Sequence, residues 1–138
     1  MLESLTVHRD SRGFLFEVLR RDNPNFTKFG QVYFIGDAER GVVRAWHRHF
    51  RMDEWFCCVR GEVDFVLYDT ASRAFSSFRL SGDSPGLLFA PREVFHGHKA
   101  LSDDALILAV CTEPYDQTDR DEERVPPDHF QYDWGGEL

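Results

Sequence analysis

Two closely spaced pairs of histidines are the residues best suited to chemistry in this sequence. His47 and His49 are separated by a single residue, and so are His96 and His98. Residues i and i+2 of a β-strand lie on the same face, so each pair directs two imidazoles the same way. An imidazole can take up or release a proton near neutral pH, and its neutral form binds transition metals. If both pairs face the interior of a barrel, they predict one small cavity for proton transfer or for a metal ion.

The residues around these pairs are typical of short β-strands. Runs rich in aromatic and β-branched residues alternate with turn signals rich in Gly, Pro, Asp and Ser. Between residues 62 and 68, alternate residues are apolar on one face, and only Val66 breaks the pattern of a half-buried strand. Helical periodicity is absent, and residues 119–124 are the one segment that admits a helical turn. We therefore expect an all-β barrel or sandwich, with Phe14 and Phe34 among its core residues.

Length and composition limit the class of protein. The 138 residues are enough for one domain, so we expect a single domain over residues 1–138. No apolar stretch is long enough to cross a membrane, so no membrane partner is expected, and the N-terminus lacks a secretory signal. Three cysteines, an odd number in a chain without such a signal, indicate reduced thiols and a cytoplasmic protein.

The net charge of −8 is unevenly distributed along the chain. Residues 101–138 hold eleven acidic and two basic residues, whereas residues 1–100 are close to neutral. No basic stripe is apparent, so we expect no nucleic-acid partner. The nearly neutral main body can still attract an anionic small molecule.

The spacing around the histidines resembles the two motifs of the cupin superfamily. Residues Gly41, His47, His49, Glu54 and Gly61 match the first motif without a departure. The second motif is degraded: Gly86, Pro91 and His96 are present, but Glu93 stands in place of a glycine and Ala100 in place of an asparagine. The resemblance covers residues 41–100 and implies a single cupin-type jelly-roll barrel. We expect the acidic segment 113–138 to pack on that barrel.

A narrower resemblance, to the dTDP-4-dehydrorhamnose 3,5-epimerase family, extends over nearly the whole chain. It rests on residues 10–13, 41–47, 59–63, 91–103, 122–126 and 132–134. That family works without metal on 4-keto-6-deoxy nucleotide sugars, removing a proton beside the ketone and returning it on the other face. The resemblance implies that His47 is the catalytic base and that Arg12, Arg44 and His96 contact the substrate. Related barrels often pair through an edge strand, so a homodimer is expected.

The sequence departs from the epimerase pattern at two places. Glu54 stands where the family has a lysine, and we expect it to contact the substrate or to fix a histidine. The tyrosine that serves as acid is missing near residues 110–111, and Tyr115 is the nearest substitute, with Tyr33 second. Strict alternation also puts Arg44 and His47 on opposite faces, so they meet only if the strand has a bulge or twist.

The sugar-nucleotide 3,4-ketoisomerases offer a second resemblance of the same kind. Their pattern of an arginine followed by two histidines matches Arg44, His47 and His49, and Tyr33 lies in a segment that resembles their substrate-binding strand. In that family both histidines shuttle protons between adjacent carbons. We therefore expect His47, His49 and Tyr115 to be catalytic, with no cofactor, in an epimerase or isomerase of a nucleotide sugar.

Two alternatives remain open from the sequence. His47, His49, Glu54 and His96 together suit a divalent transition metal such as zinc, iron or manganese, which would make the protein a metal-dependent cupin enzyme. A metal-bound His47 is unable to act as a base, so the two interpretations exclude each other at that residue. The third hypothesis is a non-catalytic cupin that binds a sugar nucleotide.

Overall fold

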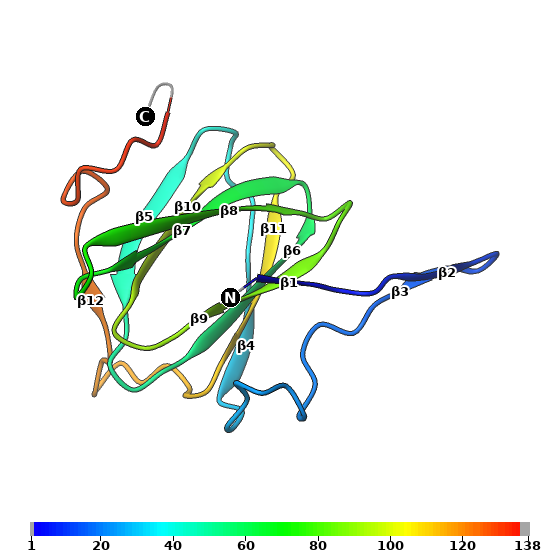
Figure 1. Ribbon diagram of the computed structural model, residues 1–138, viewed down its shortest axis with the longest axis horizontal. Coiled ribbons are helices and arrows are strands. Elements are labelled where there is room, and N and C mark those ends of the chain that lie inside the picture. Colours follow the sequence, from blue (N-terminus) through cyan, green and yellow to red (C-terminus); the bar gives the residue numbers. More distant parts are fainter. Residues whose placement is uncertain (1, 136–138) are drawn as a thin grey trace.

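The computed structural model describes residues 2–135, and the described part is built from strands without a helix. One sheet has the order β1-β9-β6-β11-β4, from Leu2–Ser4, Gly86–Ala90, Glu54–Arg60, Leu106–Cys111 and Gln31–Ile35. The second has the order β12-β5-β10-β7-β8, from Glu123–Arg124, Val43–Arg48, Phe95–Ala100, Glu62–Asp69 and Ala74–Ser81. All pairings are antiparallel, and the two sheets face each other as a barrel (Figure 1). The predicted all-β jelly-roll barrel is confirmed.

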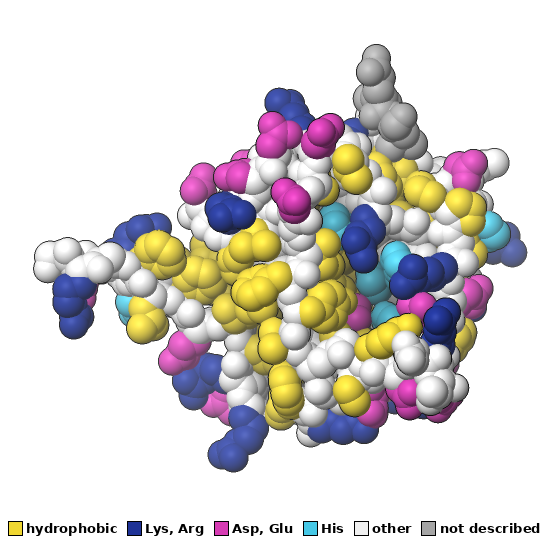
Figure 2. Space-filling view, turned by 180° about the vertical axis from the view of Figure 1, so that it is seen from behind, with side chains coloured by type: hydrophobic (Ala, Val, Ile, Leu, Met, Phe, Trp, Pro, Cys, Tyr) yellow, Lys and Arg dark blue, Asp and Glu magenta, His cyan; other side chains and the backbone are white. Residues whose placement is uncertain are grey.

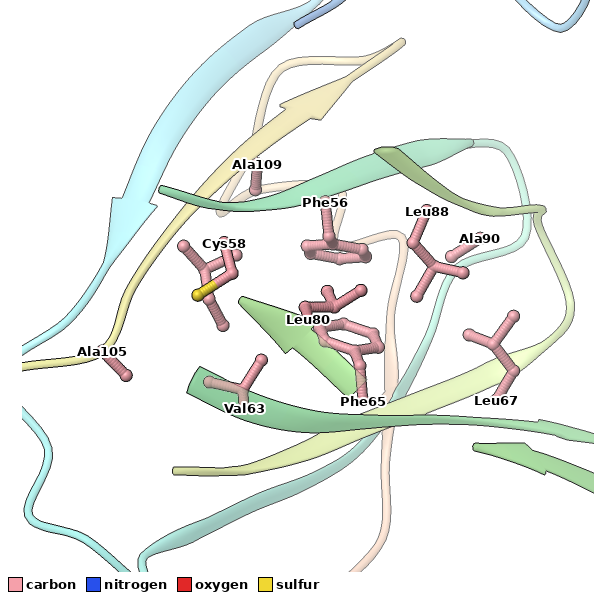
Figure 3. Close-up of a cluster of buried hydrophobic side chains, with 11 residues drawn as sticks. Phe56, Cys58, Val63, Phe65, Leu67, Leu80, Leu88, Ala90, Ala105 and Ala109 are labelled. Carbon is pink, nitrogen blue, oxygen red and sulfur yellow. The ribbon is translucent and has the colours of Figure 1, made fainter. Parts of the chain in front are cut away.

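The core fills the space between the two sheets. Phe56 of β6 and Phe65 of β7 pack against each other across the barrel, with ring centroids 4.5 Å apart and planes tilted by 36° (Figure 3). Aliphatic side chains from both sheets, including Leu67, Leu80 and Leu88, surround them. Burying a Phe or Leu side chain stabilises the fold by about 1.5–3 kcal/mol each. The core closes one end of the barrel and leaves the other free for a site.

A second cluster of buried apolar residues lies on the outer face of the second sheet. Val66, which broke the alternation of its strand, is fully buried there with Trp46 and Trp134. The C-terminal residues Phe130 and Tyr132 cover Trp46 with edge-to-face contacts. The strand β7 is therefore buried on both faces, which explains its extra apolar residue. The final segment of the described chain is packed along the barrel.

The two-stranded sheet β2-β3, from His8–Asp10 and Gly13–Leu15, projects away from the barrel as a hairpin (Figure 1). Phe14 at its tip is 63% exposed, and Phe34 on the edge strand β4 is exposed to the same extent. The prediction that both belong to the core is wrong, because among residues 2–135 no second layer covers that face of either strand. Apolar side chains gather on and beside the hairpin (Figure 2).

The segment 119–124 was also predicted incorrectly. It admits a helical turn by sequence, but Glu123–Arg124 form strand β12 against β5. The backbone of β5 supplies hydrogen-bond partners that outweigh weak local preferences. Within the described residues, no helix has the length and apolar character that crossing a membrane requires.

Candidate active site

A cavity of about 230 Å³ opens at the end of the barrel that the core leaves free. Four histidines line it: His47, His49, His96 and His98. Figure 2 shows histidine side chains in a hollow of the surface, with basic side chains around its rim. Both predicted histidine pairs therefore converge on one site.

A bulge in β5 brings Arg44 and His47 to the same cavity. In the pairing with β10, His96 lies opposite His47 and Gly97 opposite Ala45, so Trp46 is an extra residue. The Ala45–Trp46 peptide bond is cis. The backbone of Trp46 pairs instead with Val125, at 2.9 and 3.2 Å, while its side chain enters the outer aromatic cluster. Because the bulge shifts the alternation by one residue, Arg44 and His47 both line the cavity.

Glu54 contacts several side chains at the floor of the cavity. It is 2% exposed, and its two carboxylate oxygens face two imidazoles. Oε1 lies 3.3 Å from Nε2 of His49, and Oε2 lies 3.0 Å from Nε2 of His96, although this second approach lacks hydrogen-bond alignment. The Tyr33 hydroxyl and the Cys111 thiol donate to Oε1 at 3.5 and 3.4 Å. Both oxygens of the Glu54 carboxylate are thus already in contact with protein groups at the cavity.

The environments of these groups set their protonation. Burial raises the pKa of Glu54, but the charge of His96 and the hydrogen bond from His49 outweigh it and hold the pKa below its usual range. Burial lowers the pKa of His49, but the hydrogen bond and charge of Glu54 outweigh it, so the net pKa is raised. The two shifts favour an ionised carboxylate at Glu54 and the charged form of the imidazole at His49, side by side at the floor.

His47 lies in the opposite kind of environment. Burial and then the nearby charges of His96, Arg124 and Arg44 lower its pKa to about 4. Its ring stacks on that of His96, with centroids 5.9 Å apart and planes 15° apart. His47 is therefore a neutral imidazole at pH 7, able to accept a proton, whereas the environment of His49 favours the charged form of its ring. Two titratable groups with pKa values pushed apart are the usual arrangement of an acid–base site.

His98 closes the deepest part of the cavity. Burial lowers its pKa to about 3, and its ring stacks on Phe65 with centroids 5.5 Å apart. A neutral, packed imidazole contributes shape rather than charge.

Two arginines supply positive charge at the cavity, and only one was predicted. Arg44 was expected from the sequence resemblance. Arg124 comes from β12, where it pairs in register with His47, and its Nε lies 3.2 Å from Glu122. The sequence carries no signal for this role, because Arg124 lies in an acidic segment whose pairing with β5 spans more than seventy residues.

The remaining predicted site residues lie at different depths. Tyr33 is inside, donating to Glu54, and burial raises its pKa above the ordinary value. Tyr115 is at the rim, where it is 56% exposed. Arg12 is outside the cavity of its own chain, at the tip of the projecting hairpin, in an exposed ion pair with Asp10 at 2.5 Å.

The predicted metal quartet is only partly assembled. Within the described residues, the ligand atoms of His49, Glu54 and His96 all lie within 4.8 Å of one another, and His47 is outside this group. Two imidazoles and a carboxylate suit a divalent transition metal. Nδ1 of His49 bonds a backbone carbonyl at 2.6 Å, as metal-bound histidines commonly do. A metal held by these three residues would leave His47 free.

Comparisons with known proteins show the family of this chain. Residues 8–122 match the family described as polysaccharide biosynthesis C-terminal domain. The chain is 32% identical to a probable low-salt glycan biosynthesis epimerase, Agl13, of Haloferax volcanii, over 99% of this chain and 94% of that protein. It is 27% identical to a TDP-4-oxo-6-deoxy-alpha-D-glucose-3,4-oxoisomerase of Aneurinibacillus thermoaerophilus, over 80% of this chain and 76% of that protein.

A solved structure extends the agreement to the fold. The crystal structure of a dTDP sugar isomerase from Desulfovibrio desulfuricans superposes with a TM-score of 0.87 at 29% identity, covering all of this chain and 92% of the other. The resemblance to cupin epimerases and ketoisomerases, drawn from the sequence, is confirmed. The chain belongs to the polysaccharide biosynthesis C-terminal domain family, as an enzyme of the epimerase and isomerase class with a cupin barrel.

Proposed function

We propose that this enzyme transfers a proton beside the ketone of a 4-keto-6-deoxyhexose carried on a nucleoside diphosphate. The observation that carries the proposal is that His47 and His49 line one cavity in environments that shift their pKa values in opposite directions. The names of the relatives, a 3,4-oxoisomerase of such a sugar and an epimerase of glycan biosynthesis, supply the substrate class.

The chemistry follows from the acidity of a carbon next to a ketone. Neutral His47 accepts the proton from that carbon, and the bonding electrons move to the ketone oxygen as an enolate. Protonated His49 donates a hydrogen bond or its proton to this oxygen, because charge developing there is best stabilised by a positioned donor. The low pKa of His47 makes it a weak base, and the negative charges of Glu122 and of the substrate diphosphate strengthen it.

The return of the proton decides the product. If it returns to the same carbon from the other face, the product is an epimer, and the donor must stand on the opposite wall. Tyr33 on β4 and Tyr115 at the rim are the hydroxyls available there. If it returns to the former carbonyl carbon on the same face, the ketone moves by one position: the former ketone oxygen takes up a proton from His49, and the hydroxyl on the carbon that lost its hydrogen gives its proton back to His49 as it becomes the new ketone. His47 in β5 and His49 directly after it lie on the same segment of the chain, which suits this second course.

The nucleotide end of the substrate needs cations. Arg44 and Arg124 both line the cavity, and Arg44 is exposed toward solvent. A guanidinium matches a phosphate by its planar pair of donors. We assign the diphosphate to this side of the cavity mouth, with the sugar ring directed inward toward the histidines.

A homodimer is part of the proposal. The hairpin β2-β3 exposes Phe14 and Leu15, at 63% and 61%, and the edge strand β4 exposes Val32 and Phe34. Apolar faces of this kind on an edge strand are commonly covered by another chain. A second copy would bury them and would give Arg12 a partner beyond its own chain. A cytoplasmic location is supported by the three buried cysteines, which are free thiols.

The test is proton exchange on the substrate itself. TDP-4-oxo-6-deoxyglucose is incubated with the enzyme in D2O, and the sugar protons are followed by NMR. The account predicts loss of the signal of a proton beside the ketone, and a product with either an inverted carbon or a displaced ketone. His47→Gln is expected to lose at least about 100-fold in rate. His129→Gln, which changes an exposed histidine outside the cavity, is the matched control. Full exchange by His47→Gln would contradict the assignment of the base.

A second candidate function rests on the close grouping of His49, Glu54 and His96. In a metal-dependent cupin enzyme these residues would hold zinc, iron or manganese, which would act as a Lewis acid on a bound oxygen. Elemental analysis of protein purified without chelator distinguishes the two. One metal per chain that disappears in Glu54→Ala supports the metal enzyme, whereas exchange by metal-free protein supports the first proposal. Tight binding of the nucleotide sugar with neither metal nor exchange would leave the non-catalytic binding protein.

A further inference from the structure

Asp121 makes an unusual set of contacts for a residue in an acidic surface segment. Its carboxylate accepts hydrogen bonds from the backbone N–H of Phe50 at 2.8 Å and from that of Arg51 at 3.0 and 3.2 Å. Its backbone carbonyl lies 2.6 Å from Nδ1 of His49. Three consecutive residues of the β5–β6 connection are therefore held by one residue that lies about seventy positions further along the chain.

The contact with the ring fixes where the proton of His49 sits. A carbonyl oxygen only accepts hydrogen bonds, so Nδ1 of His49 must carry a proton and donate it. Nε2 is then the atom that faces Glu54, at 3.3 Å, and the cavity. Without the carbonyl the ring has no described partner on its Nδ1 side, and it is free to turn about its χ2 angle.

The hydrogen bonds between the Asp121 carboxylate and the backbone fix the position of the chain that carries the His49 ring. His49 is the first residue after β5, and the next two residues of the loop, Phe50 and Arg51, have exposed side chains. Two adjacent N–H groups converging on a carboxylate form a small anion-binding nest. These hydrogen bonds to the Asp121 carboxylate keep the loop from drawing His49 away from the floor of the cavity.

The chain supporting Asp121 is itself anchored. Directly after it, β12 pairs with β5, and Arg48 binds Glu123 at 2.7 Å. Further on, the Trp46 indole donates to the Pro127 carbonyl at 3.2 Å. The position of Asp121 is thus set by contacts with Trp46 and Arg48, the two residues that flank His47.

We infer that Asp121 is the positioning residue of the active site: its carboxylate holds the backbone after His49, and its carbonyl orients the His49 ring with Nε2 toward Glu54. The inference rests on the proposed function, in which His49 acts on the substrate oxygen. It adds a role for Asp121, which places a catalytic group without itself touching the substrate.

The neighbouring Asp119 offers a matched control. It is an acidic residue of the same segment, and it pairs with the side chain of Arg51 at 3.2 Å on the surface. Asp119→Ala therefore removes a carboxylate and an ion pair from the same loop without touching His49. Asp121→Asn keeps one side-chain oxygen as acceptor, whereas Asp121→Ala keeps none.

The experiment measures kcat and KM of the full chain for proton exchange on TDP-4-oxo-6-deoxyglucose. We expect Asp121→Ala to lower kcat by about 10- to 100-fold with KM changed by less than about twofold, because a misplaced catalytic group mainly slows the chemical step. Asp121→Asn should recover part of kcat, and Asp119→Ala should match the wild type. Wild-type kcat in Asp121→Ala, or an equal loss in Asp119→Ala, would overturn the inference.

A second measurement separates this inference from the proposed function. In protein labelled with ¹⁵N at histidine, NMR reports which ring nitrogen carries a proton. We expect a protonated Nδ1 at His49 in the wild type and in Asp119→Ala, with that signal broadened or lost in Asp121→Ala. If the wild type fails to exchange the sugar proton but shows this signature, the proposed function fails and the orientation of His49 by Asp121 stands. An unprotonated Nδ1 in the wild type overturns the inference whatever the activity.

Discussion

Replacing Glu54 by Gln tests whether the charge at the floor of the cavity is matched to His49. The substitution keeps the size of the side chain and its capacity for hydrogen bonds, so packing is unchanged and the lost quantity is charge. In the wild type the carboxylate faces Nε2 of His49 at 3.3 Å and Nε2 of His96 at 3.0 Å. In the variant His49 loses the largest of the contributions that raise its pKa, and burial, which lowers that pKa, is then opposed only by Asp121.

The magnitude follows from the difference between charged and neutral hydrogen bonds. A hydrogen bond to a charged group contributes about 1.5–3 kcal/mol and a neutral one about 1, so we expect Glu54→Gln to lower the free energy of unfolding by about 2 kcal/mol. For a domain of this size, that loss corresponds to a fall in Tm of about 7 °C. Glu62→Gln is the control, because Glu62 is an exposed carboxylate 3.7 Å from Arg79.

The effect of this substitution depends on pH in a direction that the structure sets. The pKa of Glu54 is lowered in the folded protein, so its contribution is present above its ordinary value of 4.5 and is lost as pH falls further. The pKa of His49 is raised, so its contribution is present below its ordinary value of 6.5 and is lost as pH rises through the raised pKa. The difference in Tm should therefore be largest between pH 4.5 and 6.5, where both groups are charged.

Scanning calorimetry of both variants across this pH range makes the measurement. A Glu54→Gln variant as stable as the wild type at pH 6, or more stable, would refute the reasoning. That result would mean that the desolvation penalty of the buried carboxylate is larger than the stabilisation by its partners, as happens for some buried ion pairs.

Three further predictions concern the substrate, the dimer and the core. Arg124→Gln should raise KM for the nucleotide sugar by about tenfold with less effect on kcat, because a cation at the cavity rim contributes equally to binding in the ground state and the transition state. Steady-state kinetics test this, with Arg120→Gln as the control. Phe14→Ser should convert a dimer to a monomer in analytical ultracentrifugation without lowering Tm of the barrel, and an unchanged sedimentation coefficient would remove the hairpin from the interface. Phe65→Ala should lower the free energy of unfolding, measured by urea titration, by about 3–5 kcal/mol, because Phe65 is fully buried against Phe56. A decrease below about 1 kcal/mol would show that the core collapses into the cavity left by the ring.

The motif spacing was sufficient to predict which histidines meet. His47, His49, Glu54 and His96 occupy the motif positions whose spacing indicates one shared interior, and all four line the cavity. The bulge at Trp46 was anticipated only as a requirement for Arg44, since a local sequence does not state where a register shift falls. What stabilises the bulge is the backbone of Val125, which is distant in sequence.

The parts that sequence reasoning missed depend on contacts between distant segments. Arg124 and Asp121 reach the site only because β12 pairs with β5, and a strand of two residues has almost no signature of its own. Phe14 and Phe34 were misplaced for the opposite reason: apolar residues in strand-like runs indicate burial, but the sequence does not say whether the same chain or another supplies the cover.

The central claim is that His47 removes a proton from the carbon beside the ketone. The most direct test is a mass measurement on TDP-4-oxo-6-deoxyglucose recovered after incubation in D2O with chelator-treated enzyme. We predict that the sugar gains deuterium on a carbon beside the ketone with the wild type and with His129→Gln, and that His47→Gln leaves it unlabelled. A sugar that stays unlabelled with the wild type, or labelling that requires an added metal ion, would contradict the account.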